Sequence, residues 1–249
     1  METKLTGDEP SEIQKKKRVK FCQNHDGEDS EHWKRNLQGV GDIKEFHWYP
    51  KPLRPRFKRL RAPRTIMNKK EKKQGAFQRP KGNKQKWFPK VQWQLVKKKK
   101  VFALITSTGK IFTVLIPTPW NNEVWAGLVN TKLAPFLRRC FPDRRSFTIL
   151  LDGEKIFRAS PPKAAYAQHG IKLLLGYSAW SSELNPAENV WPWAEDYLRK
   201  YERGNSIFEA FQGDIQEAIK EYPAPGKLVG SMAKRCKDCI KRHGDHLGC

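Results

Sequence analysis

The chain has 249 residues, of which 49 are Lys or Arg and 26 are Asp or Glu, so its formal net charge is +23 at pH 7. Hydrophobic residues make up 38% of it, enough for a packed core, which excludes wholesale disorder. Such a charge excess predicts a polyanionic partner, with a merely solubilising surface as the alternative. A membrane role is disfavoured, because no basic stretch is cleanly amphipathic and no apolar run is long enough to span a bilayer.

The cysteines and the first residues bear on the compartment. Five cysteines, an odd number in scattered positions, fit reduced thiols in a cytosolic or nuclear protein. Met1 to Pro10 are acidic and polar, unlike a signal peptide. The run from Lys15 to Lys20 would serve as a nuclear localisation signal, although such runs arise easily in a chain this basic. We therefore expect a nuclear protein.

The first forty residues predict two short helices and a strand. Residues 1 to about 14 are interpreted as a disordered leader. A helix from Gln14, a polar loop from Asn24 to Ser30 and a second helix around Trp33 are predicted to follow. Leu37 to Asp42 is the predicted first strand, although its two glycines weaken it.

Residues 51 to 100 differ in composition from the rest of the chain. Lys or Arg occupies 20 of these 50 positions, and Glu71 is the one acidic residue. Cations interleaved with aromatic residues suit a phosphate backbone and unstacked bases, so we predict that this stretch binds DNA. The alternative is a basic disordered linker. The candidate DNA contacts are Arg54, Arg56, Lys58, Arg59, Arg61, Arg64, Lys84, Lys86, Trp87 and Trp93.

The second half of the chain alternates strands and helices. Val101 to Thr106 and Ile111 to Ile116 flank a turn and predict a β-hairpin. Asn121 is the predicted cap of a helix that runs to Cys140 with apolar residues at helical spacing. The other predicted elements are strands over 146–151 and 171–175, and helices over 161–169, 187–203, 206–221 and 229–243. This order predicts a mixed sheet with an antiparallel edge and helices on its faces.

Asp152 and Glu188 stand where acidic metal ligands are often found. Asp152 ends an apolar strand, and Glu188 lies just inside a helix with Asn185 as cap and Pro186 as first residue. A carboxylate at the end of a strand and another on a later helix commonly hold a divalent metal. Each residue also has a simpler role, Asp152 as a helix cap and Glu188 as an acid near a positive helix N-terminus.

The octapeptide Leu184-Asn185-Pro186-Ala187-Glu188-Asn189-Val190-Trp191 resembles the L-N-P-I-E-N-x-W signature of the DDE transposases of the Tc/mariner superfamily. In that family the Glu is the third catalytic carboxylate, and the second is an Asp that ends a strand about 35 residues earlier, where Asp152 stands. Residues 18–22 and 33–46 are similar to the start of the family's catalytic domain, which makes Asp42 the first carboxylate. Asp42 as a turn residue is the alternative. Residues 231–235, Ser-Met-Ala-Lys-Arg, are similar to the family's closing helix.

The resemblance implies a ribonuclease-H-like fold, in which a mixed sheet is flanked by helices. It places a polar leader and short helices in 1–35, the catalytic domain in 36–205 with a basic insertion over about 47–100, and a helical extension in 206–249. The three carboxylates would hold two Mg²⁺ or Mn²⁺ ions about 4 Å apart. The implied activity is metal-dependent cleavage and transfer of DNA strands. The expected partners are DNA and a second copy of the chain, with no small-molecule cofactor.

The sequence departs from the family pattern at several places. The family usually has Asp-Glu at its first site, where this chain has Asp42-Ile43, and a His five residues after the second Asp, where it has Phe157. Residues 177–183 replace the usual W-P-x-x-S-P-D. We also expect the family's paired helix-turn-helix modules to be absent from the first hundred residues. These departures motivate the alternative function, a non-catalytic nucleic-acid-binding protein derived from a transposase.

Cys236 and Cys239, with His243 and Cys249 close behind, approximate a zinc knuckle. Their spacings differ from the usual ones. The same residues fall on the helix with which the family closes its catalytic domain. A structural helix is therefore the favoured interpretation of this segment, and a zinc site is the alternative.

Overall fold

The computed structural model describes residues 10–48, 97–177, 181–200 and 207–247. Within these residues five strands form one mixed sheet in the order β3-β2-β1-β4-β5. The antiparallel part contains β1 (Gly39–Trp48), β2 (Lys97–Thr106) and β3 (Ile111–Leu115). The parallel part continues from β1 to β4 (Phe147–Leu150) and β5 (Ile171–Leu173). The predicted ribonuclease-H-like arrangement is confirmed.

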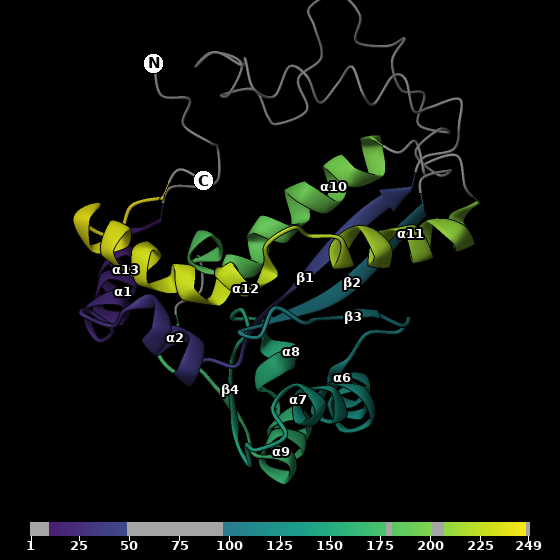
Figure 1. Ribbon diagram of the computed structural model, residues 1–249, viewed down its shortest axis with the longest axis horizontal. Helices are drawn as coiled ribbons and strands as arrows, with labels where there is room; N and C mark the ends of the chain where they lie inside the picture. The colour runs from purple at the N-terminus through teal and green to yellow at the C-terminus, as the bar shows by residue number, and fades with distance from the viewer. Residues whose placement is uncertain (1–9, 49–96, 178–180, 201–206, 248–249) are drawn as a thin grey trace, which may run out of the picture.

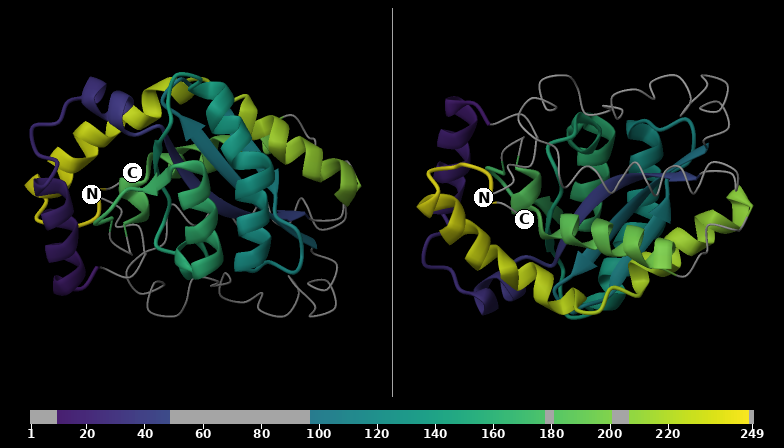
Figure 2. Two further views of the ribbon diagram at one scale, coloured as in Figure 1. Left: turned by 90° about the horizontal axis from the view of Figure 1, so that it is seen from below. Right: turned by 90° about the horizontal axis from the view of Figure 1, so that it is seen from above.

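Helices cover both faces of this sheet (Figures 1 and 2). α10 and α11 lie over one face, and α6, α7, α8 and α9 lie under the other, while α1, α2 and α13 pack together at one end. The α-helices of the described residues are α1 (Glu12–Gln23), α2 (Ser30–Asn36), α6 (Asn122–Leu128), α7 (Ala134–Cys140), α8 (Lys155–Arg158), α9 (Ser160–His169), α10 (Val190–Lys200), α11 (Phe208–Lys220), α12 (Pro225–Leu228) and α13 (Met232–Lys241).

The sheet separates two hydrophobic cores because side chains alternate along its strands. On β2, Val101, Ala103 and Ile105 enter the core beneath α10 and α11. Phe102 and Leu104 point the other way, into the core with α6, α7 and α9. All five are fully buried. A strand buried on both faces reads as a continuous apolar run, which is the pattern that predicted it.

Several predicted boundaries are confirmed by local chemistry. The hairpin forms as expected, and the Asn121 side chain accepts a hydrogen bond from Val124 N at 2.9 Å as the cap of α6. That helix reaches α7 through a π-helical stretch, Val129–Leu133. Gly170 ends α9 in the left-handed conformation, with φ of 68°. The first helix begins two residues earlier than predicted, because Ser11 forms a capping box with Gln14.

The prediction for the first strand was wrong at its end. β1 starts at Gly39 and continues to Trp48, so Asp42 lies inside the strand. Its glycines reflect close packing, since a Cβ on Gly41 would come within 2.8 Å of Leu151 and 3.0 Å of Phe102. β1 pairs with β2 up to Trp48 and Lys97, and residues 49–96 of the predicted insertion lie outside the described residues.

The segment after β5 is helical, as predicted, with different boundaries. The turn at Pro186–Asn189 is a 3-10 turn, and α10 begins only at Val190. α8 was not predicted, since it spans four residues between Asp152 and α9. Among the described residues, no helix is both long and apolar enough to cross a membrane. The proposed domain boundaries remain a prediction.

Candidate active site

Asp42 is the most buried of the three candidate carboxylates, with 6% of the residue exposed. It lies on the face of β1 that α10 covers, and Trp191 Nε1 donates a hydrogen bond to its Oδ2 at 2.7 Å. Burial raises the pKa of Asp42 to about 7, and the charge of Glu188 adds to this effect, while the Trp191 hydrogen bond opposes it. A buried acid with so little compensation is a typical feature of a functional site.

Glu188 faces Asp42 from the 3-10 turn that precedes α10. The turn is capped as predicted, because Asn185 Oδ1 accepts a hydrogen bond from Ala187 N at 3.1 Å and Pro186 is its first residue. The carboxyl groups of Asp42 and Glu188 are close enough for each to shift the pKa of the other. Burial raises the pKa of Glu188, against the lowering effects of Lys44 and of Asp42.

Asp152 was predicted to follow its strand directly, but β4 ends at Leu150, so Asp152 lies two residues beyond the strand, where it is half-buried. Its Oδ1 accepts a hydrogen bond from Glu154 N at 3.1 Å, so it also caps the turn that leads into α8. Burial raises the pKa of Asp152, and its negative charge raises the pKa of both Asp42 and Glu188. Asp152 therefore stabilises the turn before α8, although the cap residue of that helix is Glu154, and its role as a metal ligand stays a prediction.

The three carboxylates are not equally close. Asp42 and Glu188 form a pair, whereas Asp152 acts on them through its charge. Among the residues that the structure describes, no three His, Cys, Asp or Glu side chains converge closely enough to hold a metal ion. The paired carboxylates still offer the oxygen donors that hard divalent cations prefer, and a cation between them would offset the repulsion that raises their pKa values.

Two residues support this site through contacts that the sequence did not predict. Trp191 was quoted for its place in the motif, but its hydrogen bond to Asp42 spans 149 positions. Asn185 was recognised as a cap, yet its Nδ2 also donates to the main-chain oxygen of Gly41 at 3.0 Å. Both side chains are buried. The signal for both residues was the motif itself, which does not say which partner each residue contacts.

The position five residues after Asp152 is used for packing. Phe157 is fully buried, and its ring lies 5.0 Å from that of Trp125 and 6.3 Å from that of Phe102. An aromatic cluster of this kind stabilises α8 against the sheet. Phe157, which stands where the family pattern has a His, therefore belongs to the core.

The remaining candidate residues fall in two groups. All predicted DNA contacts between Arg54 and Trp93 lie outside the described residues. Cys236 and Cys239 are buried on α13 and face Cys22 of α1, whose pKa is raised to about 12, chiefly by the Cys236 thiol. His243 follows α13, and Cys249 lies outside the described residues. Among the described residues, Cys236, Cys239 and His243 do not form a group that could hold a metal ion, and the zinc alternative as a whole stays untested because it includes Cys249.

The mixed five-stranded sheet with this strand order defines a ribonuclease-H-like domain. Its candidate carboxylates lie on the central strand (Asp42), just beyond the neighbouring strand β4 (Asp152) and on the covering turn (Glu188). Known structures place it more narrowly. The catalytic domain of Mos1 mariner transposase matches with a TM-score of 0.62 and 14% identity, over 97% of this chain and 99% of that chain. The same domain with raltegravir and Mg matches with a TM-score of 0.61 and 14% identity, over 95% and 98%.

The Mos1 strand transfer complex matches with a TM-score of 0.57 and 15% identity, over 98% of this chain and 66% of that one. The present chain thus spans about two thirds of the length of the transposase in that complex. No family profile and no curated protein matches the sequence. The chain has the fold of a mariner transposase catalytic domain, and the fold that the resemblance to the Tc/mariner superfamily implied is confirmed.

Proposed function

We propose that this protein cleaves and joins DNA strands in a metal-dependent reaction of the DDE transposase kind. The observation that carries the proposal is the buried pairing of Asp42 with Glu188, with Asp152 acting on both, in the fold of a mariner transposase catalytic domain. These acids come from a strand, a turn and a loop that lie far apart in the sequence. Carboxylates brought together in this way suit phosphoryl transfer assisted by divalent cations.

Asp42, Asp152 and Glu188 would together hold two Mg²⁺ or Mn²⁺ ions. When bound, such ions activate the attacking hydroxyl and stabilise the leaving oxygen. The contribution of the chain is to hold the ligands still. Trp191 fixes one oxygen of Asp42, and Asn185 ties the Glu188 turn to the main chain of Gly41. Donors that orient a ligand in this way commonly matter almost as much as the ligand itself.

Duplex DNA is the proposed substrate, and a homodimer is the proposed assembly. The net charge of +23 supports a polyanionic substrate.

A nuclear location is proposed as well, since Lys16, Lys17 and Lys20 are exposed on α1. A fluorescent fusion in which these three lysines are replaced by Ala should lose nuclear accumulation. Unchanged accumulation would show that the signal lies elsewhere.

A nicking assay on supercoiled plasmid tests the activity. The wild-type protein with Mn²⁺ should nick or join DNA, and Asp152→Asn or Glu188→Gln should abolish the reaction while leaving DNA affinity unchanged. Glu123→Gln, which removes an exposed acid from the first turn of α6, is the matched control. Equal nicking activity in Glu188→Gln and wild-type protein would contradict the proposed function.

A second function, non-catalytic binding of nucleic acid, is favoured by one observation. Within the described part of the chain no three potential ligands converge on a metal position. Calorimetry with Mn²⁺ discriminates between the two functions. A working site should bind Mn²⁺ and lose that binding in Asp152→Ala, whereas a protein that only binds DNA should show salt-dependent affinity and no dependence on metal.

A further inference from the structure

Two arginines from opposite ends of the chain converge on Glu183, five residues before Glu188. Arg18 of α1 is fully buried, forms an ion pair with the Glu183 carboxylate and donates to the main-chain oxygen of Asp245 at 3.3 Å. Arg235 of α13, with 8% of the residue exposed, donates to the main-chain oxygen of Glu183. Both arginines stand in the segments that resemble the family's motifs, yet the proposed chemistry uses neither of them.

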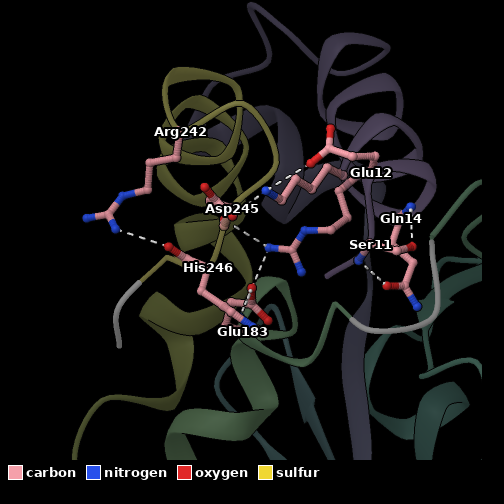
Figure 3. Close-up of polar contacts among 9 residues, drawn as sticks. Ser11, Glu12, Gln14, Glu183, Arg242, Asp245 and His246 are labelled. Atoms are coloured by element: carbon pink, nitrogen blue, oxygen red, sulfur yellow. Dashed lines mark hydrogen bonds and ion pairs between the residues drawn. The ribbon is translucent and has the colours of Figure 1, made fainter. Parts of the chain in front are cut away.

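The Glu183 carboxylate has a further contact. His246 Nδ1 lies 3.0 Å from Glu183 Oε1, and the two side chains point toward each other in Figure 3. Asp245, beside His246, also forms an ion pair with Lys15 at 3.1 Å. Helix α1, helix α13 and the residues after it therefore enclose Glu183.

A short path of main-chain hydrogen bonds connects the turn that contains Glu183 to Glu188. Glu183 lies in the 3-10 turn Ser182–Leu184, and Asn185 N donates to Ser182 O at 2.8 Å. Glu188 N then donates to Asn185 O at 3.1 Å, while the Asn185 side chain holds Gly41 beside Asp42. The segment from Glu183 to Glu188 is thus held at Glu183 by two arginines and at Asn185 by β1.

We propose that Arg18 and Arg235 are positioning residues for Glu188, acting through Glu183. The catalytic consequence of this inference rests on the proposed function. A buried guanidinium requires an acceptor, so Glu183 can move away only by leaving Arg18 without its counter-charge. Since Glu183 cannot move freely, the turn that follows it is held against Asp42. Helices α1 and α13, which lie outside the sheet, become part of the support of the site.

Amide hydrogen exchange tests the positioning without reference to activity. The main variant is the double substitution Arg18→Met with Glu183→Gln, because removing both buried charges together is far less disruptive than removing one. Exchange at Ala187 and Glu188 should rise about tenfold or more, while amides of the β1–β2 pair remain protected. Lys17→Met, which removes an exposed charge from the same helix, is the control and should change neither region.

Conservative variants separate positioning from general packing. Arg18→Lys keeps a cation for Glu183 and should restore most of the protection at Ala187 and Glu188. Arg235→Lys loses the planar fork that reaches the Glu183 carbonyl and should raise exchange in the same turn. If the double variant does not fold, exchange in Arg235→Lys still tests the inference. Wild-type exchange at Ala187 and Glu188 in a folded double variant or in Arg235→Lys would overturn the inference.

The nicking assay on supercoiled plasmid tests the catalytic consequence of the inference. The double variant should nick about 10- to 100-fold more slowly than wild-type protein, with unchanged affinity for DNA and weaker binding of Mn²⁺. A wild-type protein that neither nicks DNA nor binds Mn²⁺ would refute the proposed function, and the exchange data would still decide whether the arginines position the turn. Faster exchange with full nicking activity would refute the catalytic consequence alone.

Discussion

Single side chains join the elements that carry the carboxylates, and Asn185 is the clearest of them. Asn185→Ala should lower the free energy of unfolding by about 1–3 kcal/mol, because it leaves the buried Gly41 carbonyl without its donor and removes a cap. Asn189→Ala, an exposed position in the same turn, should change it by less than about 0.5 kcal/mol. Urea unfolding of both variants provides the comparison, and equal effects would contradict the assigned role.

The stability contribution of Glu183 should depend on pH. Burial is the largest single effect and raises the pKa of Glu183, but the hydrogen bond and the charge of Arg18, with a smaller contribution from His246, together lower it more, so the net shift is downward. A carboxyl group whose pKa is lowered by folding stabilises the protein above its unfolded pKa, about 4.3, and loses that effect as the pH falls through the folded value.

Unfolding experiments on wild-type protein and Glu183→Gln test this dependence. The wild-type protein should be more stable than the variant at pH 7, and the difference should narrow below about pH 4. The same difference at pH 3 and pH 7 would show that the ion pair with Arg18 does not control the titration of Glu183.

At the scale of elements, substitution by Ala should change the stability of the protein in opposite directions at Gly170, which ends α9, and at Gly213, inside α11. Gly170→Ala places a side chain in the left-handed conformation and within 2.5 Å of the Arg145 main-chain oxygen, so it should cost at least about 1–2 kcal/mol. Gly213, inside α11, has open space around it, and Gly213→Ala should stabilise the protein by about 0.5–1 kcal/mol. Thermal unfolding should therefore shift the two midpoints in opposite directions; shifts of the same sign would contradict this assignment.

At the scale of the whole molecule, the distribution of charge should determine how DNA is bound. Residues 51–96 carry 16 of the 49 Lys and Arg residues and one acidic residue. If they engage six to ten phosphates, the slope of log affinity against log salt should be about −5 to −9. Because Trp48 pairs with Lys97 across the two strands, a short Gly-Ser turn can replace the segment without separating β1 from β2.

The replacement variant should bind duplex DNA with a flatter salt dependence, while circular dichroism shows a folded domain. Tryptophans 87 and 93 are removed with it, so any stacking on opened strands, about 1–3 kcal/mol per base, should also be lost. A variant that binds plasmid as tightly and with the same slope would show that the contact surface lies elsewhere.

The sequence predicted features that depend on neighbouring residues. Asn121 as a cap, Gly170 as a stop and the hairpin formed by two apolar runs around a turn all follow from local backbone chemistry, and all are confirmed. The first strand was predicted to end at Asp42 and not at Trp48, and its two glycines weakened the prediction because glycines are normally read as strand breakers. Here Gly41 is needed by the close approach of Leu151 and Phe102, and nothing near Gly41 in the sequence indicates that approach.

The sequence by itself determined the order of strands and helices, the excess of positive charge and the residue types that suit a metal-dependent reaction. Only the tertiary structure decided which of these residues contact one another. Trp191 binds Asp42 across 149 positions, and Arg18 reaches Glu183 across 165. Such contacts leave no periodic or local signal, because they arise when separately formed elements are packed around one sheet. A motif can mark Arg18 or Trp191 as noteworthy, but the carboxylate that each one holds is fixed by the packing.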